Sequence, residues 1–249
     1  ENIIMAACLA KGKTIIRNAA LEPEIDDLIS VLKKMGANII RLNKNIIEII
    51  GVDYLKGFAH NVMSDRIEAG TYAMAAVITA GKLKLLNADE KYLKNVLSYL
   101  KKAGACINCD KDTIEIEGPK RIKTVNVKTE VYPGFPTDLQ AQAMAIMTIA
   151  NGNSIIEESI FENRFMHIAE LIRFGADISI KGVKAYIKGC NNLNGAQVMA
   201  TDLRASSSLI LAGLKAEGET IINRVYHLDR GYEKLEQKLS LCGAKIKRI

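Results

Sequence analysis

The chain has 249 residues, of which 49% are hydrophobic and 25% charged, and its formal net charge is +6. This composition is ordinary for a globular protein with one large or two medium domains. No apolar run reaches the roughly 18 residues of a membrane span, and five cysteines without framework spacing do not indicate a disulfide scaffold. We therefore expect a cytoplasmic protein that does not bind a membrane.

The positive charge is compatible with nucleic acid or with small anionic ligands. The chain contains no long Lys/Arg run, and aromatic residues, which would stack on bases, make up only 5% of it. We therefore expect acidic small molecules rather than nucleic acid as partners.

An internal repeat organises the whole chain. Four times, an apolar helix closed by glycine is followed by a β-branched strand, an amphipathic helix closed by Gly-Ala, and further strand sequence. The first helices end at Gly12, Gly81, Gly152 and Gly218, at intervals of 69, 71 and 66 residues. The Gly-Ala ends begin at Gly36, Gly104, Gly175 and Gly243, at intervals of 68, 71 and 68 residues.

The second repeat shows the pattern in full. Its segments are "RIEAGTYAMAAVITAG", "KLKLLNA", "KYLKNVLSYLKKAGA", "CINCD" and "TIEIEG". The first helix is apolar nearly all round, whereas the second has a Lys/Glu face for solvent. The pattern predicts an α/β fold of βαβαββ units, read cyclically, with helices inside and sheets outside.

Both ends of the chain differ from the repeat. Glu1 begins inside a helical pattern without an N-cap, and the fourth repeat stops after "AKIKRI" without the last strand of the earlier repeats. We expect a preceding segment, and a missing strand that is supplied from elsewhere.

Two acids stand at the start of buried helices in the third and fourth repeats, Asp138 in "PGFPTDLQAQAMA" and Asp202 in "ATDLRAS". A carboxylate there can cap the helix and interact with its dipole. However, the equivalent edges of these repeats also carry Arg164, Arg204 and Arg230. Three guanidinium groups beside a carboxylate are typical of a site for a carboxylate or phosphate.

Six strings extend these motifs over almost the whole chain: "EPEIDDL", "DRIEAGTYAMAA", "PGFPTDLQAQAMA", "FENRFMHIAELIRFGADI", "GAQVMATDLRAS" and "AEGETIINRVYHLDRGYEKLEQKL". They resemble the enolpyruvyl transferases that act on UDP-N-acetylglucosamine. The resemblance implies the inside-out α/β barrel, built from two domains of three βαβαββ units each. Residues 1–63 would then be the last unit of the first domain, truncated at its start, and residues 64–249 the three-unit second domain.

The resemblance implies transfer of the enolpyruvyl group of phosphoenolpyruvate to the 3-hydroxyl of UDP-N-acetylglucosamine. Phosphate would be released through a tetrahedral intermediate, in the first committed step of peptidoglycan synthesis. No cofactor and no metal are implied. Asp138 would take the hydroxyl proton, while Arg204 and Arg230 would hold the carboxylate and phosphate of phosphoenolpyruvate.

Further residues are assigned by the same resemblance. Arg164 matches an arginine at the domain interface, Asp202 an acid that orients the arginines, and Glu22 a glutamate at the cleft rim. Ile160 and Phe161 match a segment that lines the sugar and uridine.

Other parts of the implied active site do not occur in this chain. The family's mobile loop with its reactive cysteine, and a Lys-Asn pair that touches both substrates, would lie upstream of Glu1. We therefore expect this chain to be inactive alone and to need an N-terminal portion to complete the site.

Three alternatives remain open. A 3-phosphoshikimate enolpyruvyl transferase shares the barrel, although its expected signatures differ from "PTDLQAQ" and "ATDLRAS". An RNA 3'-phosphate cyclase uses related repeats and would exploit the positive charge. The third alternative is a non-catalytic fragment.

Overall fold

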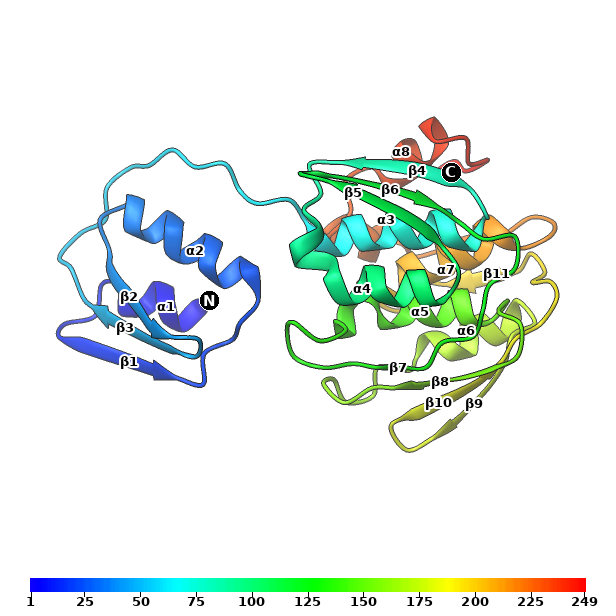
Figure 1. Ribbon diagram of the computed structural model, residues 1–249, viewed down its shortest axis with the longest axis horizontal. Helices are drawn as coiled ribbons and strands as arrows, with labels where there is room; N and C mark the ends of the chain where they lie inside the picture. The colour runs from blue at the N-terminus through cyan, green and yellow to red at the C-terminus, as the bar shows by residue number, and fades with distance from the viewer. The chain divides into compact units, whose positions relative to one another are not determined.

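The computed structural model describes residues 1–249 and divides them into two units (Figure 1). One unit comprises Glu1–Ser64 with Val131–Pro133, and the other comprises Asp65–Glu130 with Gly134–Ile249. None of the helices combines the length and apolar character that a bilayer span requires.

The first unit contains one copy of the repeat. Its elements are α1 (Asn2–Ala7), β1 (Lys13–Arg17), α2 (Pro23–Lys34), β2 (Asn38–Asn43) and β3 (Ile46–Ile50). The strands form an antiparallel sheet in the order β1-β3-β2. Alternate residues of β3, Ile47 and Ile49, are fully buried, and Ile39 of β2 and Ile29 and Leu32 of α2 are buried with them. This alternation is the two-residue period expected of a sheet with one covered face.

The second unit contains the other three copies. Its elements are α3 (Arg66–Ile78), β4 (Lys82–Leu86), α4 (Glu90–Lys102), β5 (Cys106–Asp110), β6 (Thr113–Glu117), β7 (Val127–Lys128), η1 (Thr137–Leu139), α5 (Gln140–Met147), β8 (Asn153–Glu157), α6 (His167–Arg173), β9 (Asp177–Lys181), β10 (Lys184–Lys188), β11 (Gln197–Met199), α7 (Leu203–Lys215), β12 (Ile221–Asn223), η2 (Val225–Arg230) and α8 (Leu235–Leu241).

The strands of this unit form three separate sheets. The orders are β4-β6-β5, β7-β8-β10-β9 and β11-β12. In the third repeat β7 runs parallel to β8, while β8, β10 and β9 pair antiparallel, which completes the predicted βαβαββ unit. The sheets do not join into one closed barrel.

Helices α3, α5 and α7 contact one another at the centre of the unit, with sheets outside them (Figure 1). Every residue of α5 is buried. The three serines 206–208 of α7 are buried as well, and their hydroxyls donate to backbone carbonyls three or four residues earlier in the chain. The predicted arrangement, with apolar helices inside and sheets outside, is confirmed.

A glycine follows the last strand in three repeats, at Gly51, Gly118 and Gly189, and each donates its N–H to the glycine after the first helix, at 2.8–3.0 Å. A Cβ on any of the three would lie between 1.6 and 2.3 Å from a backbone oxygen of the helix end. Close approach of two backbones therefore explains why these positions are glycine.

The fourth repeat differs from the prediction. Residues 244–249, expected to form a strand, have no strand structure, and β12 pairs only with β11. In the earlier repeats this segment pairs with the last strand of its own repeat, and the fourth repeat has no such strand to supply the hydrogen bonds.

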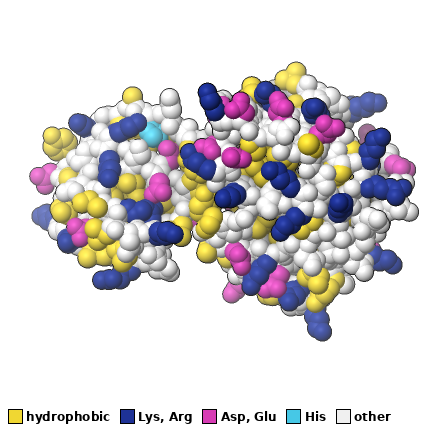
Figure 2. Space-filling model, viewed as in Figure 1, with side chains coloured by type: hydrophobic (Ala, Val, Ile, Leu, Met, Phe, Trp, Pro, Cys, Tyr) yellow, Lys and Arg dark blue, Asp and Glu magenta, His cyan; other side chains and the backbone are white.

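Exposed sheet faces carry ion pairs between adjacent strands. Lys84 contacts Glu115 at 3.0 Å and Lys184 contacts Glu157 at 3.2 Å. Figure 2 shows Lys and Arg side chains spread over the visible surface, with acidic groups between many of them. Exposed pairs of this kind contribute little to stability.

Candidate active site

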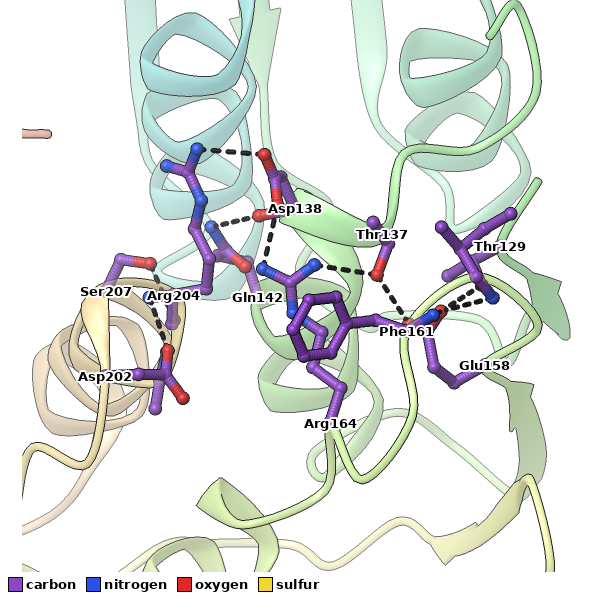
Figure 3. A network of polar contacts seen from close by, with 12 residues as sticks. Thr129, Thr137, Asp138, Gln142, Glu158, Phe161, Arg164, Asp202, Arg204 and Ser207 are labelled. Atoms are coloured by element: carbon purple, nitrogen blue, oxygen red, sulfur yellow. Dashed lines mark hydrogen bonds and ion pairs between the residues drawn. The ribbon is translucent and has the colours of Figure 1, made fainter. Parts of the chain in front are cut away.

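Asp138 lies in η1, the single turn that leads into α5. Its carboxylate does not cap that helix. Instead, Oδ1 accepts a hydrogen bond from Arg164 Nη2 at 2.7 Å, and Oδ2 accepts one from Arg204 Nη2 at 3.0 Å (Figure 3). Both carboxylate oxygens are thus held by guanidinium groups from distant parts of the sequence.

Arg204 is positioned by the start of α7. Asp202 is the N-cap of this helix, and its Oδ1 accepts from the backbone N–H groups of Arg204 at 2.7 Å and Ala205 at 2.8 Å. Asp202 therefore fixes the first turn that carries Arg204, and it does so through the backbone rather than by contact with a guanidinium group. The capping interpretation holds for Asp202 and is wrong for Asp138.

Arg164 lies in the segment between β8 and α6. Its Nη1 donates to Thr137 Oγ1 at 2.8 Å while Nη2 binds Asp138. The guanidinium carbon lies 5.1 Å from the centroid of the Phe161 ring. Arg164 is thus restrained by η1 on one side and by the ring of Phe161 on another.

A buried acid, Glu158, completes the network (Figure 3). Its Oε2 accepts from Thr137 Oγ1 at 2.8 Å, and its Oε1 accepts from Thr129 Oγ1 at 2.7 Å and from the backbone N–H groups of Ile160 and Phe161 at 2.9 and 3.0 Å. Our sequence analysis missed Glu158, because a glutamate in a polar connecting segment gives no pattern that indicates burial.

The charges at the site hold Asp138 ionised. Burial raises the pKa of Asp138, but the guanidinium groups of Arg204 and Arg164 outweigh burial, so the pKa lies below its ordinary value. Burial also lowers the pKa of Arg204, but the nearby Asp138 carboxylate outweighs burial, so the pKa of Arg204 lies above its ordinary value. The Asp138 side chain keeps 38% of its exposure, against 16% for Arg164 and 17% for Arg204, so the carboxylate remains within reach of solvent.

A second group of polar side chains lies behind Asp138. Gln142 of α5 donates to the backbone carbonyl of Asp138 at 3.1 Å and to Thr71 Oγ1 of α3 at 3.2 Å. The Thr71 hydroxyl also bonds the Tyr232 hydroxyl at 2.8 Å. These contacts tie η1 to both α3 and the segment after η2.

The other predicted residues do not bind the Asp138 carboxylate. Arg230 is exposed at the end of η2 and does not contact Asp138. Ile160 and Phe161 are 44% and 60% exposed, so both can still contact a ligand. Glu22 belongs to the first unit, where it immediately precedes α2.

Taken together, the repeats and the charged network define an α/β protein in which two arginines bind a partly exposed carboxylate. The chain belongs to the EPSP synthase (3-phosphoshikimate 1-carboxyvinyltransferase) family, whose model matches residues 1–239. Solved structures show the same fold. An enolpyruvyl transferase, NikO from Streptomyces tendae, is 24% identical with a TM-score of 0.89 over 98% of this chain and 58% of its own. An EPSP synthase from Acinetobacter baumannii is 19% identical with a TM-score of 0.73 over 98% of this chain and 60% of its own.

Curated relatives are more similar in sequence. Proteins named UDP-N-acetylglucosamine 1-carboxyvinyltransferase from Endomicrobium trichonymphae and Pelagibacter ubique are 55% and 56% identical over all 249 residues. The corresponding protein of Geobacter metallireducens is 54% identical. The chain spans about 60% of the length of these relatives.

Proposed function

We propose that this chain contributes to the transfer of the enolpyruvyl group from phosphoenolpyruvate to the 3-hydroxyl of UDP-N-acetylglucosamine, with release of phosphate. One observation carries the proposal: the Asp138 carboxylate is clamped between Arg164 and Arg204. This arrangement occurs in a chain that is 53–56% identical to relatives named for this carboxyvinyl transfer. That identity favours UDP-N-acetylglucosamine over shikimate 3-phosphate or RNA as the substrate, and favours an enzyme over a non-catalytic fragment.

In the proposed reaction the sugar 3-oxygen forms a bond to C2 of phosphoenolpyruvate while Asp138 takes the hydroxyl proton. Protonation of C3 gives a tetrahedral intermediate. Loss of phosphate from C2 and of a proton from C3 then restores the double bond in the product. The chain's own contribution is a carboxylate that stays ionised and reaches solvent.

The arginines supply the charge that this chemistry needs. Both substrates are anionic, and developing charge on the phosphate is stabilised by fixed guanidinium groups in a partly buried site. Arg204, which contacts Asp138, would bind the carboxylate and phosphate of phosphoenolpyruvate, and Arg230 would bind the same substrate when it is present. Phe161, whose ring lies beside Arg164, would line the sugar and uridine with Ile160, and Glu22 of the first unit would be a further substrate-binding residue.

We further propose that residues 1–63 form the last repeat of a first domain and residues 64–249 a second domain. Because the chain spans about 60% of its relatives, the remaining part would supply the reactive cysteine loop and the Lys-Asn pair. The five free cysteines of this chain are compatible with a cytoplasmic location.

The proposal is tested by UDP-N-acetylglucosamine-dependent release of phosphate from phosphoenolpyruvate. The assay is run with this chain alone and again with a separately made N-terminal portion of the Pelagibacter ubique relative. We expect release only in the mixture, and loss of that release with Asp138→Ala. Turnover by this chain alone would contradict the need for the N-terminal portion, and release that survives Asp138→Ala would contradict the role of Asp138.

A further inference from the structure

Glu158 differs from the other acids of the site because it is buried without a cationic partner. The residue is 4% exposed and takes four hydrogen bonds, all from neutral donors. Burying a carboxylate is costly unless its oxygens are hydrogen-bonded, and here two donors are backbone N–H groups that cannot turn away. The surrounding structure therefore holds Glu158 in one orientation.

The donors come from two parts of the candidate site. Oε1 binds the backbone of Ile160 and Phe161, the segment proposed to line the sugar and uridine. Oε2 binds the hydroxyl of Thr137, the residue directly before Asp138. A single carboxylate thus joins the substrate-lining segment to the turn that carries the proton acceptor.

The Thr137 hydroxyl extends this connection in one direction. Arg164 Nη1 can only donate a hydrogen bond, so Thr137 Oγ1 is the acceptor in their 2.8 Å contact. The single hydroxyl hydrogen is then left for Glu158 Oε2, which is a pure acceptor when ionised. The result is an ordered chain from Glu158 through Thr137 and Arg164 to Asp138 (Figure 3).

We propose that Glu158 and Thr137 are positioning residues that hold the Arg164–Asp138 pair in register with the Ile160–Phe161 segment. Neither residue needs to touch the reacting atoms. Through them, the segment that receives the sugar nucleotide and the carboxylate that takes its proton move as one body. This inference rests on the proposed function for its catalytic meaning, whereas the hydrogen-bonded chain itself can be tested without turnover.

The first test is a titration of the Asp138 carboxyl carbon by NMR in the 249-residue chain. Thr137→Val keeps the shape of the side chain and removes the hydroxyl, so Arg164 loses one anchor and the pKa of Asp138 rises. Thr137→Ser keeps the hydroxyl and leaves the pKa at the wild-type value. The charged groups facing Asp138 are Arg164 and Arg204, and neither variant changes them. At the start of α3, Glu68 is paired with Lys238 at 2.8 Å and is also unchanged.

The same spectra report the other end of the chain of contacts. Thr137→Val removes one donor from Glu158, so the amide resonances of Ile160 and Phe161 shift, while Thr137→Ser leaves them in place. Equal titration curves and equal amide resonances in both variants would overturn the proposal. Because both measurements need no substrate, they are decided even if the phosphate-release assay fails.

The second test separates binding from chemistry in the phosphate-release assay. Glu158→Gln keeps one oxygen for the Ile160 and Phe161 N–H groups but places a donor opposite Thr137. We expect kcat to fall on the order of 10-fold to 100-fold, as misplacement of a reacting group does, with KM for UDP-N-acetylglucosamine changed less than about threefold. Unchanged kcat in Glu158→Gln and in Thr137→Val would contradict a positioning role. Absence of turnover in the wild type, with the titration as expected, would reject the proposed function. The titration would still support the series of hydrogen bonds from Glu158 to Asp138.

Discussion

Arg204 donates from Nη2 to Oδ2 of Asp138 at 3.0 Å, although 66 residues separate the two. The contact joins the first turn of α7 to the turn before α5, so the buried helices of two repeats meet in one ion pair. Because Arg204 keeps 17% of its side-chain exposure, this pair is less screened by solvent than a surface pair.

Replacing Arg204 tests whether a planar guanidinium is required. In Arg204→Lys we expect kcat/KM for phosphoenolpyruvate to fall on the order of 10²-fold to 10³-fold, because a lysine cannot hold a carboxylate or phosphate through two parallel hydrogen bonds. The phosphate-release assay with the N-terminal portion present measures this. Arg224→Lys is the matched control, since Arg224 is exposed and binds only the Tyr226 hydroxyl and Met199 sulfur. Equal losses in both variants would argue against a special role for Arg204.

The buried His167 predicts how stability depends on pH. Burial lowers the pKa of His167 to about 4, with a further decrease from Arg164 and an opposing increase from Asp202. Between pH 6.5 and 4, His167 binds a proton in the unfolded chain but stays neutral in the native state. Native stability therefore falls as the pH drops through this window.

We expect His167 to lower the free energy of unfolding by on the order of 3 kcal/mol from pH 7 to pH 4. His167→Leu removes this contribution, so urea denaturation should show a flatter pH dependence in the variant. Other acids of the chain contribute equally to both proteins and cancel in the comparison. Parallel curves for the two proteins would show that His167 does not titrate in this way.

Tyr232 tests the polar contacts behind Asp138. The residue is 1% exposed, and its hydroxyl contacts Thr71 Oγ1 at 2.8 Å and Gln142 Nε2 at 3.4 Å. Tyr232→Phe leaves these groups with fewer partners and should lower the free energy of unfolding by about 1–3 kcal/mol. The exposed Tyr226→Phe should change it by less than about 0.5 kcal/mol. Denaturant titration of both variants compares them, and a neutral Tyr232→Phe would show that the buried contacts are replaced, for example by water.

Gly189 tests the close approach of strand end and helix end. A Cβ at Gly189 would lie 1.7 Å from the backbone oxygen of Ala150, so Gly189→Ala must displace the backbone and should cost at least about 3 kcal/mol. At Gly182 a Cβ would meet nothing within 4 Å, although φ is +59°. Gly182→Ala should therefore cost only about 1 kcal/mol, from the left-handed conformation. Thermal or urea unfolding separates the two, and equal losses would rule out steric exclusion as the reason for Gly189.

The repeat, the order of helices and strands in the first three repeats, and the burial of α3, α5 and α7 could be predicted from the sequence alone, whereas α1, which is just as apolar, buries only Ile4 and Ala7. These features follow from local rules: the spacing of apolar residues, the glycines that end helices, and the period of two in strands. For the same reason the sequence predicted Asp138 beside Arg164, Arg204 and Arg230, since equivalent positions of equivalent repeats lie at the same edge. The structure brings Asp138 into contact with Arg164 and Arg204 but not with Arg230.

Which of these residues touch could be learned only from the folded arrangement. It showed that Asp202 caps α7 whereas Asp138 binds two guanidinium groups, a difference that two similar Thr-Asp strings do not reveal. It also showed that Glu158 is buried beside Thr137 and that residues 244–249 have no strand structure. Each outcome depends on partners distant in the sequence, because a buried carboxylate needs donors and a strand needs a neighbour, and no local pattern specifies either.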